Sequence, residues 1–311
     1  MRTYALAQAG AAPAFADADI PDPAPGEARI RIAAASVNGF DLAVAAGYMT
    51  GFFDHLYPVV LGREFAGVVD AVADDVSDLA VGDRVLGVVS KPHLHEGAFA
   101  EYTTVPTGDC VIAPAALTMP EAASLAHTGS AALAILAALG SDLRGRTVLI
   151  VGATGGVGTL LVQLASAEGA TVIATGRTAE GRALLVELGA AHAVDYTEDL
   201  AADVRAVAVD GVDAAVHLHG DPDEIAPLVH QGGRFISPLL YSPEQFGKPW
   251  VEFVPIAAYP TPAGLHRLAE LVEAGRLRVI VDREFAWEDT PNAFAAFGRE
   301  TLGNLVVRVG E

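Results

Sequence analysis

The chain has 311 residues, of which 52% are hydrophobic and 19% charged, a composition typical of a globular protein long enough for two domains. Its 39 acidic residues outnumber its 19 lysines and arginines and give a formal net charge of -20. A surface of this charge repels phosphate backbones and anionic lipids, so we expect no nucleic-acid or membrane partner. The single cysteine, Cys110, excludes an internal disulfide and a cysteine-rich zinc site, and we interpret it as a small core residue.

The first residues alternate like a β-strand and lack the charged and apolar regions of a signal peptide. Apolar runs elsewhere are interrupted by glycine or charge well before the ~18 residues of a membrane-spanning helix. We therefore expect a cytoplasmic protein.

Residues 1–117 show short alternating apolar stretches separated by Gly, Pro and Asp, for example at 28–33, 67–73 and 83–89. This pattern predicts many short strands in a barrel-like arrangement. Proline-rich and Gly-Asp segments between the stretches are typical of turns.

From about residue 118 the pattern changes to alternating strands and helices. The strands are predicted at 147–151, 171–175, 193–194, 214–217 and 234–237, and the helices at 156–169, 180–188, 199–208 and 222–230. This order predicts a parallel, doubly wound sheet, an α/β fold.

A helix at 262–275 and short strands at 279–281 and 304–309 follow. Because these last strands share the character of the first segment, we expect the chain to return to its first domain. The predicted domains are 1–117 with 258–311, and 118–257.

A glycine-rich segment between a buried strand and a helix is the most informative motif. It has the form G-x-x-G-G-x-G, and glycines at such a turn let the N–H groups of the helix start face a pyrophosphate. The alternative is a tight turn without a ligand. The candidate cofactor residues here are Gly152, Thr154, Gly155, Gly156, Val157 and Gly158.

The end of the second strand bears on which dinucleotide binds. An NAD site usually has Asp or Glu at this position, to accept hydrogen bonds from the ribose 2′-hydroxyl. Here the strand ends Thr175-Gly176-Arg177, and the next acid is Glu180. An arginine suits a 2′-phosphate, so we predict NADPH, with a solvated cation at a helix start as the alternative interpretation of Arg177.

With these motifs the chain resembles the zinc-independent quinone-oxidoreductase branch of the medium-chain dehydrogenase/reductase superfamily over nearly its whole length. The resemblance rests on the combination of motifs and on their order. The matching segments besides the glycine loop are 36–41, 61–67, 81–85, 97–102, 120–123, 188–190, 195–196, 232–234 and 303–307.

The resemblance implies a GroES-like β-barrel catalytic domain, a Rossmann cofactor domain, an active site in the cleft between them, and a homodimer. It also implies that Asn38, Asp41 and Tyr48 lie near the nicotinamide and the substrate, and that Tyr196 lies near the adenosine phosphate. A purely structural role is the alternative for Asp41.

The zinc-dependent members of the superfamily hold their metal with a Cys and a His from the first domain. Asn38 and Arg63 stand at the corresponding positions here, and the adjacent Glu64 is retained. Because a guanidinium cannot ligate zinc and the thiolate is missing, we predict no metal. Hydride transfer without a Lewis acid suits a conjugated acceptor, so we predict a quinone or an α,β-unsaturated carbonyl as substrate.

The chain departs from the family pattern in several places. Gly39 stands where the family often has Pro, and the Arg that it often has near Ala45 is missing. The threonine that the family has near the start of the cofactor domain is replaced by Ala131, with Ser130 or Thr128 as possible substitutes. The fourth strand of the cofactor domain ends in His217 and His219, where many members have an acid and a glycine pair.

The histidines leave alternatives open. His93 and His95 are spaced to share one face of a strand and could bind a metal, although solvated polar residues are the simpler interpretation. His217 and His219 are interpreted as satisfied polar residues at a strand end rather than as catalysts.

Three functions remain compatible with the sequence. The first is an NADPH-dependent quinone oxidoreductase, and the second is an enoyl or enone reductase of a biosynthetic pathway. The third is a non-catalytic NADPH-binding redox sensor.

Overall fold

The chain forms two compact units in a computed structural model that describes residues 1–299 and 301–310. Unit 1 comprises Met1–Ser130 and Pro260–Glu311, and unit 2 comprises Ala131–Tyr259. Unit 1 thus extends past residue 117, the boundary that the change of sequence pattern suggested. The apportioning of residues to independent folding domains stays a prediction.

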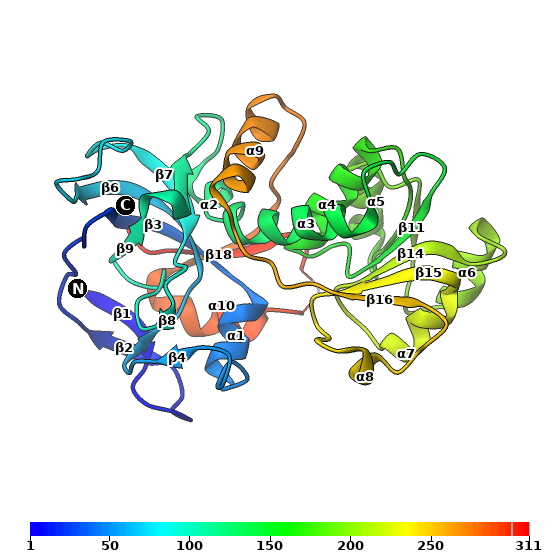
Figure 1. The fold of residues 1–311 in the computed structure, drawn as a ribbon, viewed down its shortest axis with the longest axis horizontal. Coiled ribbons are helices and arrows are strands. Elements are labelled where there is room, and N and C mark those ends of the chain that lie inside the picture. Colours follow the sequence, from blue (N-terminus) through cyan, green and yellow to red (C-terminus); the bar gives the residue numbers. More distant parts are fainter. Residues whose placement is uncertain (300, 311) are drawn as a thin grey trace. The chain divides into compact units, whose positions relative to one another are not determined.

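Unit 1 is built on a seven-stranded sheet that takes strands from both ends of the chain (Figure 1). The strand order is β10-β7-β6-β3-β18-β17, and β9 also pairs with β3. A three-stranded sheet, β2-β1-β5, and the pair β4-β8 complete the strands. Their bounds are β1 (Arg2–Leu6), β2 (Ala14–Asp17), β3 (Glu27–Val37), β4 (Asp54–His55), β5 (Val59–Val60), β6 (Glu64–Val72), β7 (Arg84–Val88), β8 (His93–Leu94), β9 (Tyr102–Pro106), β10 (Cys110–Ile112), β17 (Val281–Ala286) and β18 (Asn304–Arg308).

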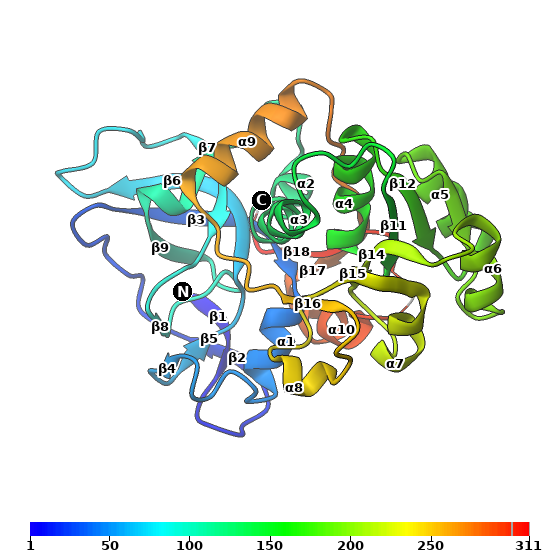
Figure 2. The same ribbon diagram turned by 45° about the vertical axis from the view of Figure 1, so that its right-hand side comes forward.

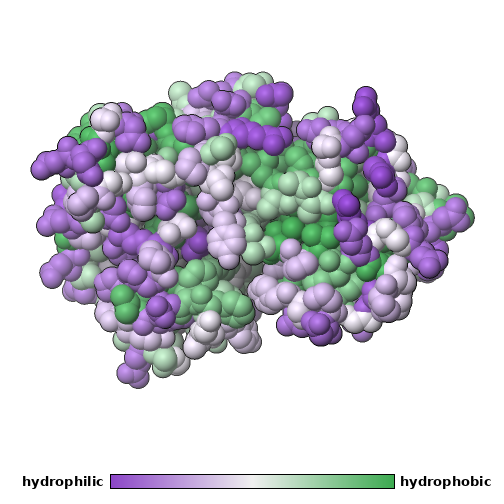
Figure 3. Space-filling model, viewed as in Figure 1, coloured by the Kyte–Doolittle hydropathy of each residue, from purple (hydrophilic) through white to green (hydrophobic). Residues whose placement is uncertain are grey.

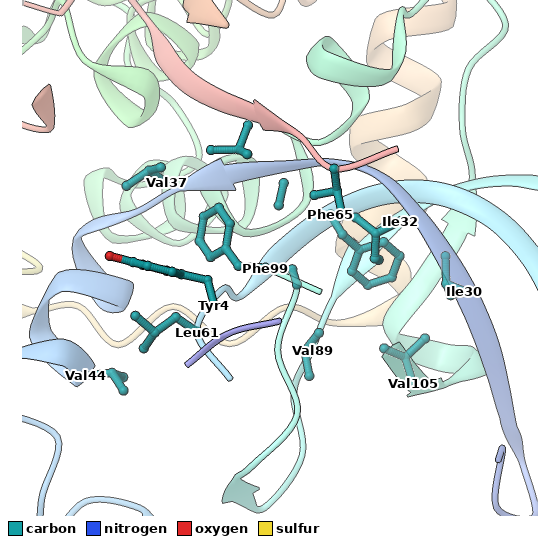
Figure 4. Close-up of a cluster of buried hydrophobic side chains, with 14 of the residues drawn as sticks. Tyr4, Ile30, Ile32, Val37, Val44, Leu61, Phe65, Val89, Phe99 and Val105 are labelled. Carbon is teal, nitrogen blue, oxygen red and sulfur yellow. The ribbon is translucent and has the colours of Figure 1, made fainter. Parts of the chain in front are cut away.

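The core of unit 1 lies between these strands. Along β3 the residues Ala28, Ile30 and Ile32 are buried, while Arg29 and Arg31 between them are more exposed, the period of two expected of a half-buried strand. Figure 4 shows side chains from distant segments meeting in this core, among them Tyr4, Phe65 and Phe99.

The helices of unit 1 are mostly short. They are α1 (Gly39–Ala45), α2 (Met119–Ala122), α9 (Pro262–Glu273) and α10 (Thr290–Ala296), and α3 (Ala126–Leu139) runs from the end of this unit's first segment into unit 2. Helix α1 follows β3 directly, and α3 starts a few residues after α2. The starts of α1 and α3 both contact Glu64, the first residue of β6.

Unit 2 has a six-stranded parallel sheet in the order β13-β12-β11-β14-β15-β16, which confirms the predicted doubly wound topology. Right-handed crossovers place α4 and α5 on one face and α6 and α7 on the other (Figures 1 and 2). The bounds are β11 (Thr147–Val151), β12 (Thr171–Thr175), β13 (His192–Val194), β14 (Val212–His217), β15 (Val229–Ser237), β16 (Glu252–Pro255), α4 (Gly156–Ala167), α5 (Ala179–Glu187), α6 (Leu200–Val207), α7 (Pro222–Ile225) and α8 (Pro243–Phe246).

The structure corrects some predicted elements. The helix expected at 222–230 ends at Ile225, a short 3₁₀ turn follows, and β15 already begins at Val229 because it pairs there with Val212 of β14. The strand expected at 279–281 begins only at Val281, where it pairs with Asn304. Strand β16 and helix α10 were not predicted.

Polar residues cover much of the surface in the view of Figure 3, and an apolar area lies over α3 in the same view. Helix α3 carries no charged side chain. Within residues 1–299 and 301–310, no helix is both long and apolar enough to cross a membrane.

Candidate active site

The glycine loop joins β11 to α4 at the carboxyl edge of the parallel sheet. Gly152 has a φ of 87°, a left-handed conformation that favours glycine, and an added Cβ there would lie 3.0 Å from the Cβ atoms of Leu218 and His219. A Cβ on Gly158 would lie 2.5 Å from the Gly152 carbonyl oxygen. Two of the predicted glycines are therefore required by packing alone.

Gly155 is different. It is the N-cap of α4, and a Cβ added to it would meet only the Gly152 oxygen, at 3.6 Å. The space in front of the helix start is thus open, and the first N–H groups of a helix have no partner within the helix. A dinucleotide diphosphate fits this arrangement.

The end of β12 is tied to the glycine loop and to the next strand. The Gly152 N–H donates to the Thr175 hydroxyl at 3.1 Å, so buried Thr175 supports the loop. Arg182 Nη1 donates to the carbonyl oxygens of Gly176 and Arg177, at 3.0 and 2.9 Å, and to Asp195 at 2.6 Å. Arg182, which sequence reasoning missed, therefore holds the turn that carries the exposed Arg177.

Tyr196 follows Asp195 and is 37% exposed. Its ring lies 6.3 Å from that of His219, which in turn lies against Gly152. The structure thus brings Tyr196, His219 and the glycine loop together at one edge of the sheet.

Both ring nitrogens of His217 have hydrogen-bond partners inside unit 2. Its Nε2 donates to the Gly220 carbonyl oxygen, and its Nδ1 accepts from the Ser237 hydroxyl, both at 3.0 Å. Burial lowers the pKa of His217, which keeps the ring neutral. This geometry supports the prediction of a satisfied structural histidine.

In unit 1, a buried polar cluster surrounds the Glu64 carboxylate, at the start of β6. One carboxylate oxygen accepts from the backbone N–H groups of His127 and Thr128, at 2.8 and 3.3 Å. The other accepts from Asn38 Nδ2 at 3.1 Å and from the Thr128 hydroxyl at 2.9 Å. Glu64 therefore joins the start of α1 to the start of α3.

Asn38 lies at the N-terminus of α1 and is only 8% exposed. Its Nδ2 donates to the Ser36 carbonyl oxygen at 3.2 Å and to Glu64 at 3.1 Å. Because an amide nitrogen carries two hydrogens, Asn38 has none left to donate to a substrate.

Asp41 caps α1 and is 1% exposed. Its carboxylate accepts from the Asn38 N–H at 2.8 Å and from the Arg63 backbone N–H. Burial, with a smaller contribution from Glu64, raises the pKa of Asp41 to about 7, and burial likewise raises the pKa of Glu64 to about 7. These contacts favour the structural alternative for Asp41.

Arg63 and His127 complete the cluster. The Arg63 guanidinium lies 4.5 Å from the centroid of the Phe40 ring, and the His127 ring lies 6.2 Å from it. Burial, assisted by the Arg63 charge, lowers the pKa of His127 to about 3. His127 escaped sequence analysis, although a histidine in the apolar run Leu125-Ala126 was a usable signal.

Other predicted positions lie apart from the cluster. Tyr48, on the turn after α1, is 74% exposed. His95 Nδ1 donates towards the carbonyl oxygens of Leu56 and Pro58, and no group of three metal-ligating side chains occurs in the described part of the chain. Cys110 is buried, and burial raises the pKa of its thiol to about 12.

Comparison with known proteins supplies the family. Residues 24–115 match the alcohol dehydrogenase GroES-like domain, and residues 188–307 match the zinc-binding dehydrogenase domain. The chloroplast envelope quinone oxidoreductase homolog of Arabidopsis thaliana is 28% identical, with 89% of this chain and 88% of that protein aligned. The 2-methylene-furan-3-one reductase of Solanum lycopersicum is 29% identical over 89% of this chain and 70% of that protein.

A solved structure agrees with these relatives. The quinone oxidoreductase from Coxiella burnetii superposes with a TM-score of 0.86 at 26% identity, covering 100% of this chain and 99% of that one. The chain belongs to the quinone-oxidoreductase branch of the medium-chain dehydrogenase/reductase superfamily. It is an oxidoreductase with a GroES-like domain and a doubly wound α/β domain.

The zinc chemistry of the superfamily does not fit these residues. The Arg63 guanidinium has no lone pair to offer, and the Asn38 amide is not one of the side chains that bind zinc, which are those of Cys, His, Asp and Glu. Both Glu64 oxygens already accept two hydrogen bonds each. A thiolate, the soft donor that zinc favours, is not among the residues of the cluster.

Proposed function

We propose that this quinone-oxidoreductase family member catalyses NADPH-dependent reduction of a quinone or an α,β-unsaturated carbonyl without zinc. The proposal rests above all on the Asn38–Arg63–Glu64 cluster, whose donors do not suit a metal. Without a Lewis acid, the acceptor must be electrophilic by conjugation. When bound, NADPH supplies the hydride, and the reduced acceptor gains its proton from water.

The preference for NADPH is inferred from Arg177. Gly155 leaves room for the diphosphate in front of α4, and Arg177 lies at the end of β12 with Arg182 and Asp195 beneath its turn. The protein's own contribution is to bind and orient: the α4 N–H groups face the diphosphate, Tyr196 flanks the adenosine, and Arg177 pairs with the 2′-phosphate. Asp195 is engaged by Arg182, so this carboxylate supports the turn.

Arg177→Ala tests the cofactor assignment. A charge-assisted phosphate contact contributes roughly 1.5–3 kcal/mol, so we expect the dissociation constant for NADPH to rise about 10- to 150-fold and that for NADH to change little. Titration by nicotinamide fluorescence measures both constants. Arg205→Ala, on α6, is the matched control. Equal effects on the two cofactors, or tighter NADH binding in the wild type, would contradict the assignment.

Two alternatives to this proposal predict different outcomes in an activity assay. The name of the Solanum lycopersicum relative, 2-methylene-furan-3-one reductase, supports an enone as the acceptor of this chain. A redox sensor would bind NADPH without turnover. A cytoplasmic homodimer is our proposal for the state of the protein.

An assay of NADPH oxidation against a panel of quinones and enones, with and without a zinc chelator, distinguishes these functions. We expect turnover that persists after exhaustive chelation, together with no stoichiometric zinc by elemental analysis. Turnover of enones alone selects the second function, and binding without turnover selects the sensor. Loss of turnover on chelation would contradict the zinc-free mechanism and would support metal binding by His93 and His95.

A further inference from the structure

His127, near the start of α3, is anchored through its backbone and is partly exposed as a residue, and Nδ1, not Nε2, is its buried ring nitrogen without a partner. Its N–H donates to Glu64 at 2.8 Å, on the carboxylate that also holds the Asn38 side chain. Its Nδ1 is buried and has no hydrogen-bond partner among the described residues. The cluster thus holds a histidine next to Asn38 whose ring is available for a hydrogen bond to a ligand.

Burial and the neighbouring charges decide the protonation of the ring. Burial disfavours the charged imidazolium most, and the Arg63 guanidinium on the neighbouring Phe40 ring acts in the same direction, so the pKa of His127 falls to about 3. Glu64 is engaged by four donors, and Asp41 accepts from the backbone of Asn38 and Arg63. Neither carboxylate makes a hydrogen bond to the imidazole, so the ring is neutral at physiological pH.

A neutral imidazole carries one hydrogen. At Nδ1 this hydrogen would be a buried donor without an acceptor, a rare and costly arrangement. We therefore assign it to Nε2, which makes Nδ1 the bare nitrogen. The Nε2–H is then the donor that His127 can offer to a ligand.

We propose that the neutral Nε2–H of His127 donates a hydrogen bond to the carbonyl oxygen of the acceptor. This inference rests on the proposed function, because it places the acceptor next to Asn38. Both amide hydrogens of Asn38 are already donated within the protein, so a hydrogen bond to the acceptor carbonyl requires another donor. His127 supplies it.

The chemistry requires only a hydrogen bond. The hydride adds with its electron pair to a carbon of the conjugated acceptor, the π electrons move onto the carbonyl oxygen, and that oxygen becomes an anion. The Nε2–H hydrogen bond strengthens as this charge develops, which is how a donor selectively stabilises a transition state. Water then gives the proton, and His127 keeps its own throughout.

Two substitutions separate the donor from the ring. H127F keeps a planar ring without a donor, and H127Q keeps an N–H donor. We expect H127F to lower kcat about 100-fold, in the range measured for removing one such donor, while H127Q retains a larger part of the activity. NADPH affinity by fluorescence and the unfolding temperature should stay near wild type in both, and His266→Gln on the exposed face of α9 is the control. A kcat for H127F within threefold of wild type overturns the proposal.

The state of the ring can be measured without turnover. Long-range ¹H–¹⁵N spectra of histidine-labelled wild-type protein should show a neutral His127 with its hydrogen on Nε2 and no change between pH 5 and 8. Adding 1,4-naphthoquinone in the presence of NADP⁺ should move the Nε2–H resonance downfield. A hydrogen on Nδ1, titration near pH 6.5, or no response to the quinone overturns the proposal.

The two proposals fail differently. If the wild type reduces quinones or enones and H127F does so equally well, only the role of His127 is wrong. If the wild type reduces neither, the proposed function fails, and the role of His127 fails with it whatever tautomer the spectra show.

Discussion

Individual residues of the unit 1 cluster are held more tightly than their motifs suggested. Asn38 and Asp41 were predicted near the substrate, but their side chains make hydrogen bonds within the protein. Asp41 accepts from the backbone at the start of α1, and Asn38 donates to Ser36 and Glu64. In the proposed mechanism, His127 is therefore the residue with a hydrogen left to donate to the acceptor. The roles of Asn38, Asp41 and Tyr48 in catalysis stay predictions.

The Asp41 carboxyl gives a test of this packing through pH. Burial raises its pKa to about 7, against about 3.9 in an unfolded chain, so the folded protein binds the extra proton between these values. Its contribution to stability is therefore present below pH ~4 and is lost as the pH rises through about 7. D41N keeps a side-chain oxygen to cap α1 and stays neutral.

We expect the unfolding free energy of D41N, relative to wild type, to increase by about 1–2 kcal/mol between pH 5 and pH 8. Urea unfolding at the two pH values measures this difference. Asp210→Asn, an exposed position in unit 2, should show no such trend. Parallel pH dependence of D41N and wild type would show that Asp41 is ionised in the folded protein over this whole range.

At the scale of elements, the β11–α4 connection contains two glycines, Gly155 and Gly158, that are required for different reasons. Gly158 is needed because backbone atoms of Gly152 and Ala153 occupy the place of its Cβ, at 2.5 and 2.6 Å. Gly155 has an ordinary φ of -75° and open space in front of it. Packing explains the first glycine, and ligand approach explains the second.

Paired alanine substitutions test this distinction. G158A should lower the unfolding temperature of the cofactor-free protein by several degrees, as overpacking by 1–3 kcal/mol does. G155A should leave that temperature within about 1 °C and raise the NADPH dissociation constant about tenfold or more, because its methyl group enters the space of the diphosphate. Thermal unfolding and fluorescence titration measure the two effects. If G155A binds NADPH normally, the diphosphate lies elsewhere.

At the scale of the whole molecule, unit 1 depends on both ends of the chain. Strand β18 pairs antiparallel with β3, from Leu305 opposite Val37 to Arg308 opposite Ala34, and so joins the last segment to the central strand of the sheet. Its side chains Leu305 and Val307 belong to the same core as Phe65 and Phe99. Residues 260–311 are therefore part of unit 1, although unit 2 separates them from it in sequence.

The sequence by itself determined the features that depend on local pattern. Continuous apolar runs such as Thr147–Val151 and Thr171–Thr175 gave correct strand bounds, because a buried parallel strand must be apolar on both faces. The glycine loop was placed between strand and helix, because few other contexts need glycines at that spacing. The discontinuous unit was inferred because its last strands share the alternation of its first.

Only the tertiary structure decided which polar atoms were already used. Residues 38, 64 and 127 are far apart in the chain, and nothing in their spacing indicates that one carboxylate binds Asn38 and the His127 backbone. The start of β15 and the edge strand β16 depended likewise on partners in space, since pairing rather than composition fixes where such strands begin. Hydrogen-bond satisfaction and strand pairing are long-range properties, and for that reason they appeared only in the folded chain.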